Sequence, residues 1–535
     1  MPLKNKTLIF LLCILLFSSG FSGCIFDNIF GTKFNLNFWN VTNNEEFPTI
    51  KLNFTASDKV ILKMFDPSLN LIDSEFFYND GETSLNIANY RETVKPGKYT
   101  LKVYNKDNSE VYKKLFTLNG PALNVISCEQ QWWEKDETFY LIGLKLSVIN
   151  NGDTPVYPCY LHTEFDNYSN TSLISPTVIS PGNNGIVESY VYYKGIPESN
   201  NFTVTIKDSD LTTLSQDTFS FDINPNVNTL SYDKGLEKTL YIPYPVYLYN
   251  YYHNLERLTD QGVEDYSVFV FDPYDDEYIN LFVDLIKKTI ISKKKQFDLK
   301  TDVEKINYIA GFVQWLEYRK DSEDNESVEY AQYPIETMFT LGGGGDCEDK
   351  AILTASLLNA IGFEVALLRL PEHMAVGVRL NDTIPGYSYY TEDYYFLETT
   401  SKGIKCGYVP EEYKNSSELT VYPINHRPFL LHNWKDDVIT IYSNTEKGDF
   451  VKVIFFVQNL GNTKAEDIVV EGVFYTENGI ELNSEKITIS SLEPGEKKKN
   501  QLSINIPEDY KTYFETRIYL NGEIVDTEKS KSSFP

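Results

Sequence analysis

The sequence predicts a multidomain protein in which one α+β domain is flanked by all-β sandwich domains. The chain has 535 residues, and at roughly 100–200 residues per domain this length predicts about three to five domains. Apolar and polar residues alternate along residues 34–226 and 429–535, as in half-buried strands, whereas residues 227–428 show helical periodicity. Hydrophobic residues make up 42% of the chain, which is enough to give each domain a core.

The first residues predict an export signal. Lysines precede an apolar run at residues 8–17, which as a helix would cover about 15 Å of a hydrocarbon core that is ~30 Å thick. The run is too short to span a membrane, so we expect residues 1–23 to be a cleaved signal peptide. Ser22-Gly23 directly before Cys24 resembles the site at which prokaryotic lipoproteins are lipidated and cut, and the alternative is an uncleaved signal anchor. Both interpretations put the rest of the chain outside the cell membrane, on its extracellular side.

Two segments of the chain repeat each other and predict the same fold twice. Residues 144–154 and 453–463 each read as a strand that ends in an Asn-x-Gly turn. A Pro-Gly turn and then an Ile-Pro-Glu step follow each segment in the same order. These segments resemble the immunoglobulin-like adhesion modules of prokaryotic surface proteins, which serve as spacers or binding modules.

Changes of pattern define the expected domain boundaries. Alternating runs at residues 50–54, 60–64 and 99–104 predict a further sandwich near the start of the chain. The expected order is a signal peptide at 1–23, a lipidated cysteine and tether at 24–33, β-sandwiches at 34–119 and 120–226, an α+β domain at 227–428 with its core at 300–405, and a β-sandwich at 429–535.

Helix signals predict where the elements of the α+β domain begin. Asp272-Pro273 is typical of an N-cap followed by proline in the first turn, and Thr301 with Glu304 forms a capping box. A third helix is predicted over residues 347–361, and it should stop at the glycine that follows. Strands are predicted at residues 363–370, 373–380 and 394–399.

A glycine-rich turn at residues 342–345 leads into Asp346 and Cys347 at the start of the third predicted helix. Glycines let the backbone turn sharply and approach other groups closely. Asp346 is expected to be the N-cap, and the unpaired N–H groups and dipole of a helix start favour a thiolate at Cys347. The competing interpretation is that Cys347 is a buried, inert cysteine.

A histidine and an acid follow in the order that thiolate chemistry requires. His373 opens a strand after the helix, and its imidazole could take the thiol proton and later protonate a leaving amine. Glu398, at the end of the next predicted strand, is expected to orient the imidazole, with Asp393 as the alternative.

This arrangement resembles the transglutaminase-like superfamily, over about a fifth of the chain. Gly345-Asp346-Cys347 opens an apolar helix, His373 opens one strand, and Glu398 stands where the family usually has aspartate. The resemblance implies a papain-like core, a Cys–His–acid triad and a thioester acyl-enzyme formed from an amide or peptide bond. Prokaryotic members are often hydrolases, so the resemblance favours hydrolysis slightly over transamidation.

An acyl transfer also needs donors for the developing oxyanion. The backbone N–H of Cys347 is one candidate. Papain-like enzymes use a glutamine as the second donor, so Gln314, a polar residue on an otherwise apolar helix, is expected in this role. The family also uses an aromatic donor, so Trp315 is the alternative.

Other features of the sequence limit which cofactors and partners we expect. The exported compartment permits a disulfide between Cys128 and Cys159, although free thiols are an equally good expectation. No metal-ligand cluster or phosphate loop is recognisable, so neither a metal nor another cofactor is predicted. A net charge of −28 repels phosphate backbones and argues against a nucleic-acid partner. Asn-x-Ser/Thr triplets, such as the one at Asn40, agree weakly with export and a glycoprotein.

Together these features predict a cell-surface cysteine enzyme, anchored in the membrane through lipid on Cys24, that acts on a protein or peptide substrate at the cell envelope. The alternative function is a lipid-anchored surface binding or adhesion protein whose transglutaminase-like domain has lost its activity.

Overall fold

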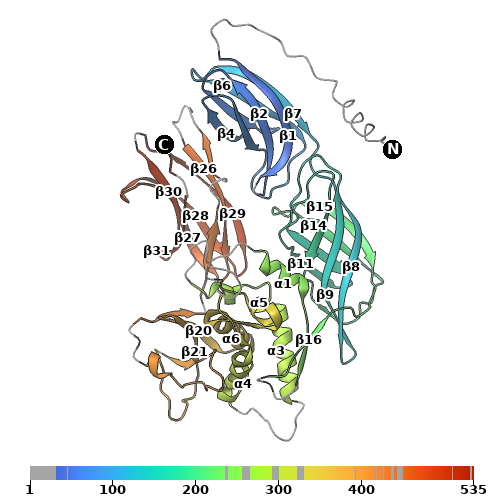
Figure 1. Cartoon of the computed structure of the whole chain (residues 1–535), viewed down its shortest axis with the longest axis vertical. Coiled ribbons are helices and arrows are strands. Elements are labelled where there is room, and N and C mark those ends of the chain that lie inside the picture. The colour runs from blue at the N-terminus through green and yellow to red at the C-terminus, as the bar shows by residue number, and fades with distance from the viewer. Residues whose placement is uncertain are drawn as a thin grey trace, which may run out of the picture.

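The computed structural model describes residues 32–534 apart from 45, 235, 237–238, 256–264, 292–300, 322–329, 392, 415, 417, 426, 435–438, 443–449, 509 and 531–532 (Figure 1). Strands far outnumber helices and form many separate sheets, so the chain is a mostly β protein of several domains. No helix in this part of the chain is long and apolar enough to cross a membrane. The expected signal peptide and Cys24 lie outside the described residues.

The first sandwich consists of two antiparallel sheets with the strand orders β1–β2–β5 and β4–β3–β6–β7. The strands are β1 (Phe34–Asn44), β2 (Phe47–Ala56), β3 (Val60–Phe65), β4 (Leu71–Phe77), β5 (Gly81–Asn86), β6 (Gly97–Asn105) and β7 (Glu110–Leu118). The inward faces of both sheets alternate with outward faces, and residues such as Leu52 and Val103 meet in one buried core.

The second sandwich pairs the sheet β12–β9–β13, to which β8 adds, with the sheet β11–β10–β14–β15. Its strands are β8 (Leu123–Lys135), β9 (Thr138–Asn150), β10 (Tyr160–Phe165), β11 (Tyr168–Leu173), β12 (Asn184–Ser189), β13 (Tyr193–Lys194), β14 (Asn201–Lys207) and β15 (Thr213–Ser220). Buried Trp132 lies in the core between these sheets.

The last sandwich pairs the sheet β24–β26–β25, to which β29 adds, with the sheet β28–β27–β30–β31. Its strands are β24 (Leu430–Asn433), β25 (Ile439–Tyr442), β26 (Phe450–Asn459), β27 (Ala465–Thr476), β28 (Glu481–Leu492), β29 (Lys497–Asn505), β30 (Thr512–Leu520) and β31 (Glu523–Lys529). Its core contains buried Val453 and Phe514.

The second and last sandwiches share one hydrogen-bonded corner, which accounts for the sequence repeat. The side-chain amide of Asn150 donates to the backbone carbonyl of Thr154 at 2.8 Å, and that of Asn459 donates to Thr463 at 2.8 Å. Each side-chain oxygen accepts the backbone N–H of the glycine two residues further on, at 3.0 and 3.1 Å. The repeated residues therefore form the same turn twice.

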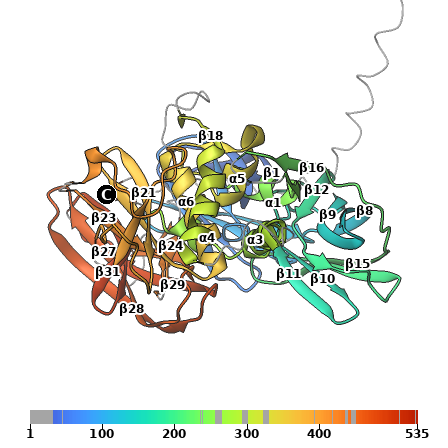
Figure 2. The same ribbon diagram turned by 90° about the horizontal axis from the view of Figure 1, so that it is seen from below.

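The α+β domain is built around an antiparallel sheet with the order β22–β21–β20–β23. Its helical segments are α1 (Val246–His253), α2 (Val268–Phe271), α3 (Asp276–Ile291), α4 (Asp302–Trp315), α5 (Pro334–Phe339), η2 (Thr340–Gly342), α6 (Cys347–Ile361) and η3 (Glu411–Tyr413). Its strands are β16 (Thr229–Tyr232), β17 (Leu240–Pro243), β18 (Glu317–Tyr318), β19 (Gly344–Gly345), β20 (Glu364–Leu370), β21 (His373–Arg379), β22 (Tyr394–Leu397) and β23 (Thr420–Pro423). Helix α6 packs on β20 and β21, and α3, α4 and α5 pack around it (Figure 2).

The predicted helix signals at Thr301 and at Cys347 are confirmed. The Thr301 hydroxyl accepts the N–H of Glu304 at 3.2 Å, and the Glu304 carboxylate accepts the N–H of Thr301 at 3.1 Å, which completes the capping box of α4. Helix α6 begins at Cys347 and ends before Gly362, which adopts the left-handed conformation with φ 103°.

The predicted helix start at Asp272 is wrong. Asp272 follows the short helix α2, and the next helix, α3, begins only at Asp276. The half-buried Asp272 carboxylate accepts the backbone N–H of Tyr274 at 2.8 Å and the hydroxyl of Tyr252 at 3.0 Å. These bonds close a turn between the two helices instead of capping α3.

The disulfide considered for Cys128 and Cys159 does not form, because both thiols are free. Cys128 lies on β8, whereas Cys159 precedes β10 in the opposite sheet of the sandwich. Burial raises the pKa of both thiols, to about 12 for Cys128. Cys128 is close to Tyr247 of α1, and Cys159 is close to Arg91 of the first sandwich, so the two sulfurs face different surroundings.

The last sandwich contacts the first two sandwiches. Lys499 on β29 forms ion pairs with Asp210 of the second sandwich at 3.2 Å and with Glu92 of the first at 3.9 Å. Strand β25 also packs against β4. Along the longest axis of the molecule, the first sandwich and the α+β domain lie at opposite ends (Figure 1).

Candidate active site

The start of helix α6 is fixed by a buried carboxylate. Asp349 accepts the backbone N–H of Asp346 at 3.2 Å and that of Gln332 at 2.7 Å. Burial, followed by the charge of Asp346, raises the pKa of Asp349 well above its usual range. A Cβ at Gly345 would collide with this carboxylate, so only glycine fits directly before the N-cap. The turn that carries Cys347 is therefore held in place by the buried Asp349 side chain.

Arg319 holds the glycine-rich turn from the other side. Its guanidinium donates to the carbonyls of Thr340 at 3.0 Å and Gly343 at 2.9 Å, and its backbone N–H donates to Gly345 at 3.1 Å. The preceding Tyr318 forms a parallel bridge with Gly345. This contact joins the end of α4 to the turn before the nucleophile, and nothing in the local sequence signals it.

His373 and Glu398 form a buried hydrogen-bonded pair. The imidazole Nε2 lies 3.1 Å from the Glu398 Oε2. The other carboxylate oxygen, Oε1, accepts the N–H groups of Thr400 at 2.7 Å and Ser401 at 3.2 Å. Burial raises the pKa of Glu398, but hydrogen bonds from His373 and Thr400 outweigh it, and the pKa falls to about 2. Glu398 is therefore an ionised carboxylate that is held in one orientation.

The Cys347 thiol interacts with His373 of this pair. It is half-buried at the tip of α6. Burial opposes protonation of His373, but interactions with the Cys347 thiol and with Glu398 outweigh it and raise the pKa of His373 to about 9. The structure thus brings together the three residues that the sequence singled out, from α6, from the start of β21 and from the segment just after β22.

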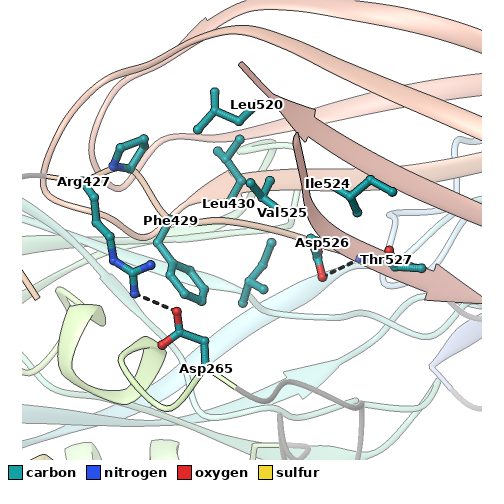
Figure 3. A pocket seen from close by; sticks show the side chains of 11 residues that line it. Asp265, Arg427, Phe429, Leu430, Leu520, Ile524, Val525, Asp526 and Thr527 are labelled. Atoms are coloured by element: carbon teal, nitrogen blue, oxygen red, sulfur yellow. Dashed lines mark hydrogen bonds and ion pairs between the residues drawn. The ribbon is translucent and has the colours of Figure 1, made fainter. Parts of the chain in front are cut away.

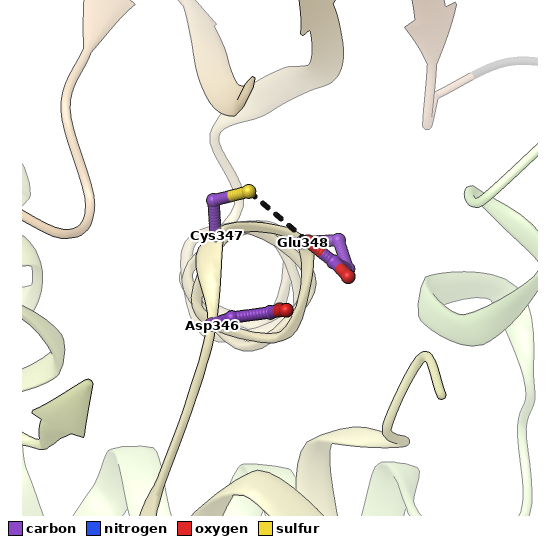
Figure 4. Close-up of side chains that lie close together, drawn as sticks. All are labelled: Asp346, Cys347 and Glu348. Atoms are coloured by element: carbon purple, nitrogen blue, oxygen red, sulfur yellow. Dashed lines mark hydrogen bonds between the residues drawn. The ribbon is translucent and has the colours of Figure 1, made fainter. Parts of the chain in front are cut away.

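A carboxylate next in sequence also contacts the thiol. The Cys347 sulfur lies 3.1 Å from the Glu348 Oε2, and Figure 4 shows the two groups pointing toward each other. Donor atoms of Asp346, Cys347 and Glu348 all lie within 4.8 Å of one another, and among the described residues no other such group of three or more occurs. These atoms could hold a divalent cation, but that cation would engage the sulfur that acyl transfer needs.

Tyr413 covers the imidazole. Its ring stacks on that of His373, with centroids 4.8 Å apart and an angle of 9° between the planes. Its own backbone carbonyl accepts the hydroxyl of Tyr390 at 2.8 Å, which fixes the short η3 turn. Sequence reasoning missed Tyr413 because η3 belongs to a loop whose position depends on the tertiary fold.

Gln314 does not have the position predicted for it as an oxyanion donor. It is buried, and its amide donates to the carbonyls of Glu398 at 2.9 Å and Ile404 at 3.0 Å. Its oxygen accepts the N–H of Gly403 at 2.9 Å. Its amide nitrogen and oxygen are therefore both engaged in holding the loop after Glu398 and are not available to an oxyanion.

The alternatives considered at the site are also resolved by geometry. Trp315 is exposed, and the ammonium group of Lys402 lies 4.4 Å from its ring centroid. Tyr318 is an aromatic residue whose hydroxyl responds to the thiol: burial, followed by the charges of Cys347 and Asp346, raises its pKa to about 12.

Asp393, the alternative orienting acid, is exposed and forms an ion pair with Arg379 at 3.5 Å. Because Glu398 already bonds to His373, Asp393 is not the group that orients the imidazole.

A cavity of about 500 Å³ lies elsewhere, between the α+β domain and the last sandwich (Figure 3). Arg427 and Asp265 form an ion pair of 2.7 Å at its edge, and Leu430 and Val525 contribute apolar surface. None of the three residues of the candidate active site lines it.

The fold and site therefore define a mostly β, multidomain protein whose α+β domain holds a Cys–His–Glu cluster.

No family model and no curated protein matches the chain. Among solved structures, red sea bream transglutaminase matches at 12% identity over 73% of this chain and 80% of its own, with a TM-score of 0.18. Dimeric latent PorU from Porphyromonas gingivalis matches at 10% identity over 94% of this chain and 34% of its own, with a TM-score of 0.17. An exo-chitosanase from Amycolatopsis orientalis matches at 7% identity over 91% and 76%, with a TM-score of 0.15. Scores this low carry no argument about function.

Proposed function

We propose that the chain is a cell-surface cysteine enzyme of the transglutaminase-like type, which attacks amide or peptide bonds through a thioester acyl-enzyme. The observation that carries the proposal is the His373–Glu398 hydrogen bond of 3.1 Å beside the Cys347 thiol at a helix start. A buried pair of this kind that only stabilised the fold would not need a half-buried thiol as its third member.

The geometry supports a division of roles. Glu398 engages the Nε2 of His373, which leaves Nδ1 as the ring nitrogen that takes the thiol proton. The Cys347 thiolate adds to the substrate carbonyl, and the carbonyl electron pair moves onto oxygen. When this pair returns, the C–N bond breaks, the amine takes the proton from His373, and a thioester remains.

Of the two oxyanion donors in this proposal, the first is the predicted one and the second is not. The backbone N–H of Cys347 is one of them, as for other nucleophiles at helix starts. The Tyr318 hydroxyl is assigned as the second, because burial and then the charge of Cys347 raise its pKa to about 12 and keep it protonated at neutral pH. Gln314 has no part in this step, because its amide is already engaged.

The second step decides the product. Water activated by His373 would release an acid and make the chain a peptidase or amidase, and an amine would give a transamidation product. Both steps use the same residues. We favour hydrolysis, because water, unlike an amine substrate, needs no acceptor site of its own.

The labelling experiment compares Cys347 with the three other described cysteines, which serve as internal controls. Burial raises the pKa of Cys128 and Cys406 to about 12 and raises that of Cys159, so these thiols should react slowly with iodoacetamide near neutral pH. Fast labelling of Cys347 alone supports an activated thiol. Labelling of Cys347 no faster than that of Cys406 would instead favour the binding-protein alternative.

Acyl transfer itself is tested by trapping. The full chain, in detergent, is incubated with an extract of the cell envelope, and the intact mass of the chain is measured over time. We expect a covalent adduct that hydroxylamine removes and that Cys347→Ala abolishes. The absence of any adduct together with slow labelling would contradict the proposal.

The membrane location is a separate part of the proposal. A lipid on Cys24 would tether the first sandwich to the membrane, and the α+β domain at the opposite end of the long axis would then reach away from it. Mass spectrometry of the N-terminal peptide tests this directly. A diacylglyceryl cysteine at position 24 is expected, and an unmodified cysteine that follows an intact signal would show the uncleaved-anchor alternative.

A further inference from the structure

Exposed apolar side chains gather along one edge of the first sandwich. Phe38 and Trp39 on β1 are 54% and 37% exposed, and Leu115 on β7 is 50% exposed. These three residues are called the aromatic edge below. Strands β1 and β7 are the outer strands of their sheets and lie side by side (Figure 1). The Trp39 ring packs on that of Phe116, with the ring centroids 4.7 Å apart. Phe38 and Leu115 face away from the core on these neighbouring strands, whereas Trp39, which follows Phe38, faces inward onto Phe116 and remains partly exposed.

The charge along this edge differs from that of the rest of the chain. Strand β1 contains no charged residue, and residues 111–118 of β7 contain Lys113 and Lys114 but no acid. Neither lysine forms an ion pair with another described residue. Residues 34–119 carry ten basic and eleven acidic residues, whereas the whole chain has a net charge of −28. Almost all of the excess negative charge therefore lies in the other domains.

We propose that the aromatic edge docks on the lipid surface of the membrane to which the chain is anchored. Aromatic rings beside lysines are typical of protein surfaces that rest at the boundary between headgroups and acyl chains. The two lysines would meet lipid phosphates, and the acidic domains would be repelled from an anionic surface. The inference rests on the membrane anchoring that is part of the proposed function, but not on the chemistry at Cys347.

The length of the tether supports lipid rather than a protein partner as the occupant. Nine residues, and thus ten Cα–Cα steps, separate Cys24 from Phe34, the first residue of β1, so the strand cannot start more than about 34 Å from the anchored residue. An apolar face tethered this closely meets the bilayer at a high effective concentration. A partner protein or a second copy of the chain would have to compete with the membrane for this face.

Tryptophan fluorescence tests the docking in the full chain. The chain is reconstituted in vesicles of phosphatidylcholine and phosphatidylglycerol, with plain or brominated acyl chains, and flotation shows whether it is bound. The difference in emission between the wild type and Trp39→Phe isolates one of the five tryptophans. We expect the Trp39 emission to shift to shorter wavelength on vesicles and to lose intensity in brominated vesicles.

Matched variants separate docking from other causes. Phe38→Ser/Leu115→Ser removes two exposed side chains of the edge and should abolish the quenching of Trp39. Ile480→Ser/Tyr510→Ser removes two side chains of the last sandwich that are 61% and 52% exposed, and it should leave the quenching unchanged. Normal labelling of Cys347 in both double variants shows that the chain remains folded.

Each other outcome overturns the inference. A chain that floats but whose Trp39 is not quenched is anchored without docking. Quenching that persists in Phe38→Ser/Leu115→Ser assigns the contact to another surface. A shift of Trp39 emission that depends on protein concentration and not on lipid assigns the edge to a second copy of the chain. A chain that does not float contradicts both the anchor and the docking, while the acyl-transfer proposal is judged by the trapping experiment alone.

Discussion

Glu398→Gln removes the charge beside His373 while keeping a side chain of similar size that can still hydrogen-bond. In the wild-type chain burial opposes protonation of the imidazole, but the interactions with Cys347 and Glu398 raise its pKa from 6.5 to about 9. Without the carboxylate charge only burial and the thiol remain. We therefore expect the pKa of His373 to return to about 6.5 or below in this variant.

The size of the effect follows from the shifts at the two partners. A change of one pKa unit corresponds to about 1.4 kcal/mol, so the fall of Glu398 from 4.5 to about 2 corresponds to roughly 3 kcal/mol. The rise in the pKa of His373 is of similar size, and because both shifts include the His373–Glu398 interaction, the two are not added. The upper limit for the loss of stability in Glu398→Gln is therefore roughly 3 kcal/mol.

The sign of the pH dependence is different for the two partners. The contribution of Glu398, whose pKa is lowered, is present above pH 4.5 and is lost as the pH falls through about 2. The contribution of His373, whose pKa is raised, is complete below pH 6.5 and is lost as the pH rises through about 9. The variant should consequently differ most from the wild type between pH 4.5 and 6.5.

A titration of the histidine rings by NMR measures the shift directly. The signal of His373 is assigned by its loss in His373→Asn. Asp393→Asn is the matched control, because this exposed carboxylate pairs with Arg379 at 3.5 Å and should not influence the ring. An unchanged pKa of His373 in Glu398→Gln, or an equal fall in the control, would refute the reasoning.

Three further predictions concern the surroundings of the site. Tyr318→Phe should slow formation of the acyl adduct by about 100-fold, measured by intact mass over time, whereas Trp315→Phe should change it little. Gln314→Ala leaves two carbonyls and one N–H of the buried loop without their partner, so the free energy of unfolding of this domain should fall by about 2–3 kcal/mol in urea; no change would mean that the loop is held by other contacts. Reducing agent should leave the melting temperature unchanged, because Cys128 and Cys159 are free, and a lower melting temperature would reveal a disulfide.

Short-range patterns in the sequence predicted those parts of the site whose cause is local. The Gly-Asp-Cys turn, the capping box at Thr301 and the glycine after α6 each depend on residues within one helical turn of each other. The repeat was recognisable for the same reason, because Asn150 and Asn459 bond within their own turns. The order of cysteine, histidine and acid was also readable along the chain.

Predictions failed where a side chain forms hydrogen bonds with residues that are distant in the sequence. Gln314 was expected at the thiol from its polarity on an apolar helix, but it bonds to a carbonyl that lies 84 residues away. Asp272 was expected to cap a helix, but the Tyr252 hydroxyl of another helix takes part in its hydrogen bonds. In both cases the residue type correctly indicated a polar side chain that makes hydrogen bonds, but the local sequence did not identify its partner.

The sequence by itself determined which residue is the candidate nucleophile, because a cysteine at a glycine-led helix start needs only its neighbours to be placed there. Only the tertiary structure decided what surrounds that thiol: Glu398 held by its own loop, Tyr413 stacked on the imidazole and Tyr318 bridged to the glycine turn. The physical reason is the range of the forces. Helix caps and turns are set by backbone geometry within a few residues, whereas ring stacking and buried carboxylates depend on how packed elements meet after the chain has folded.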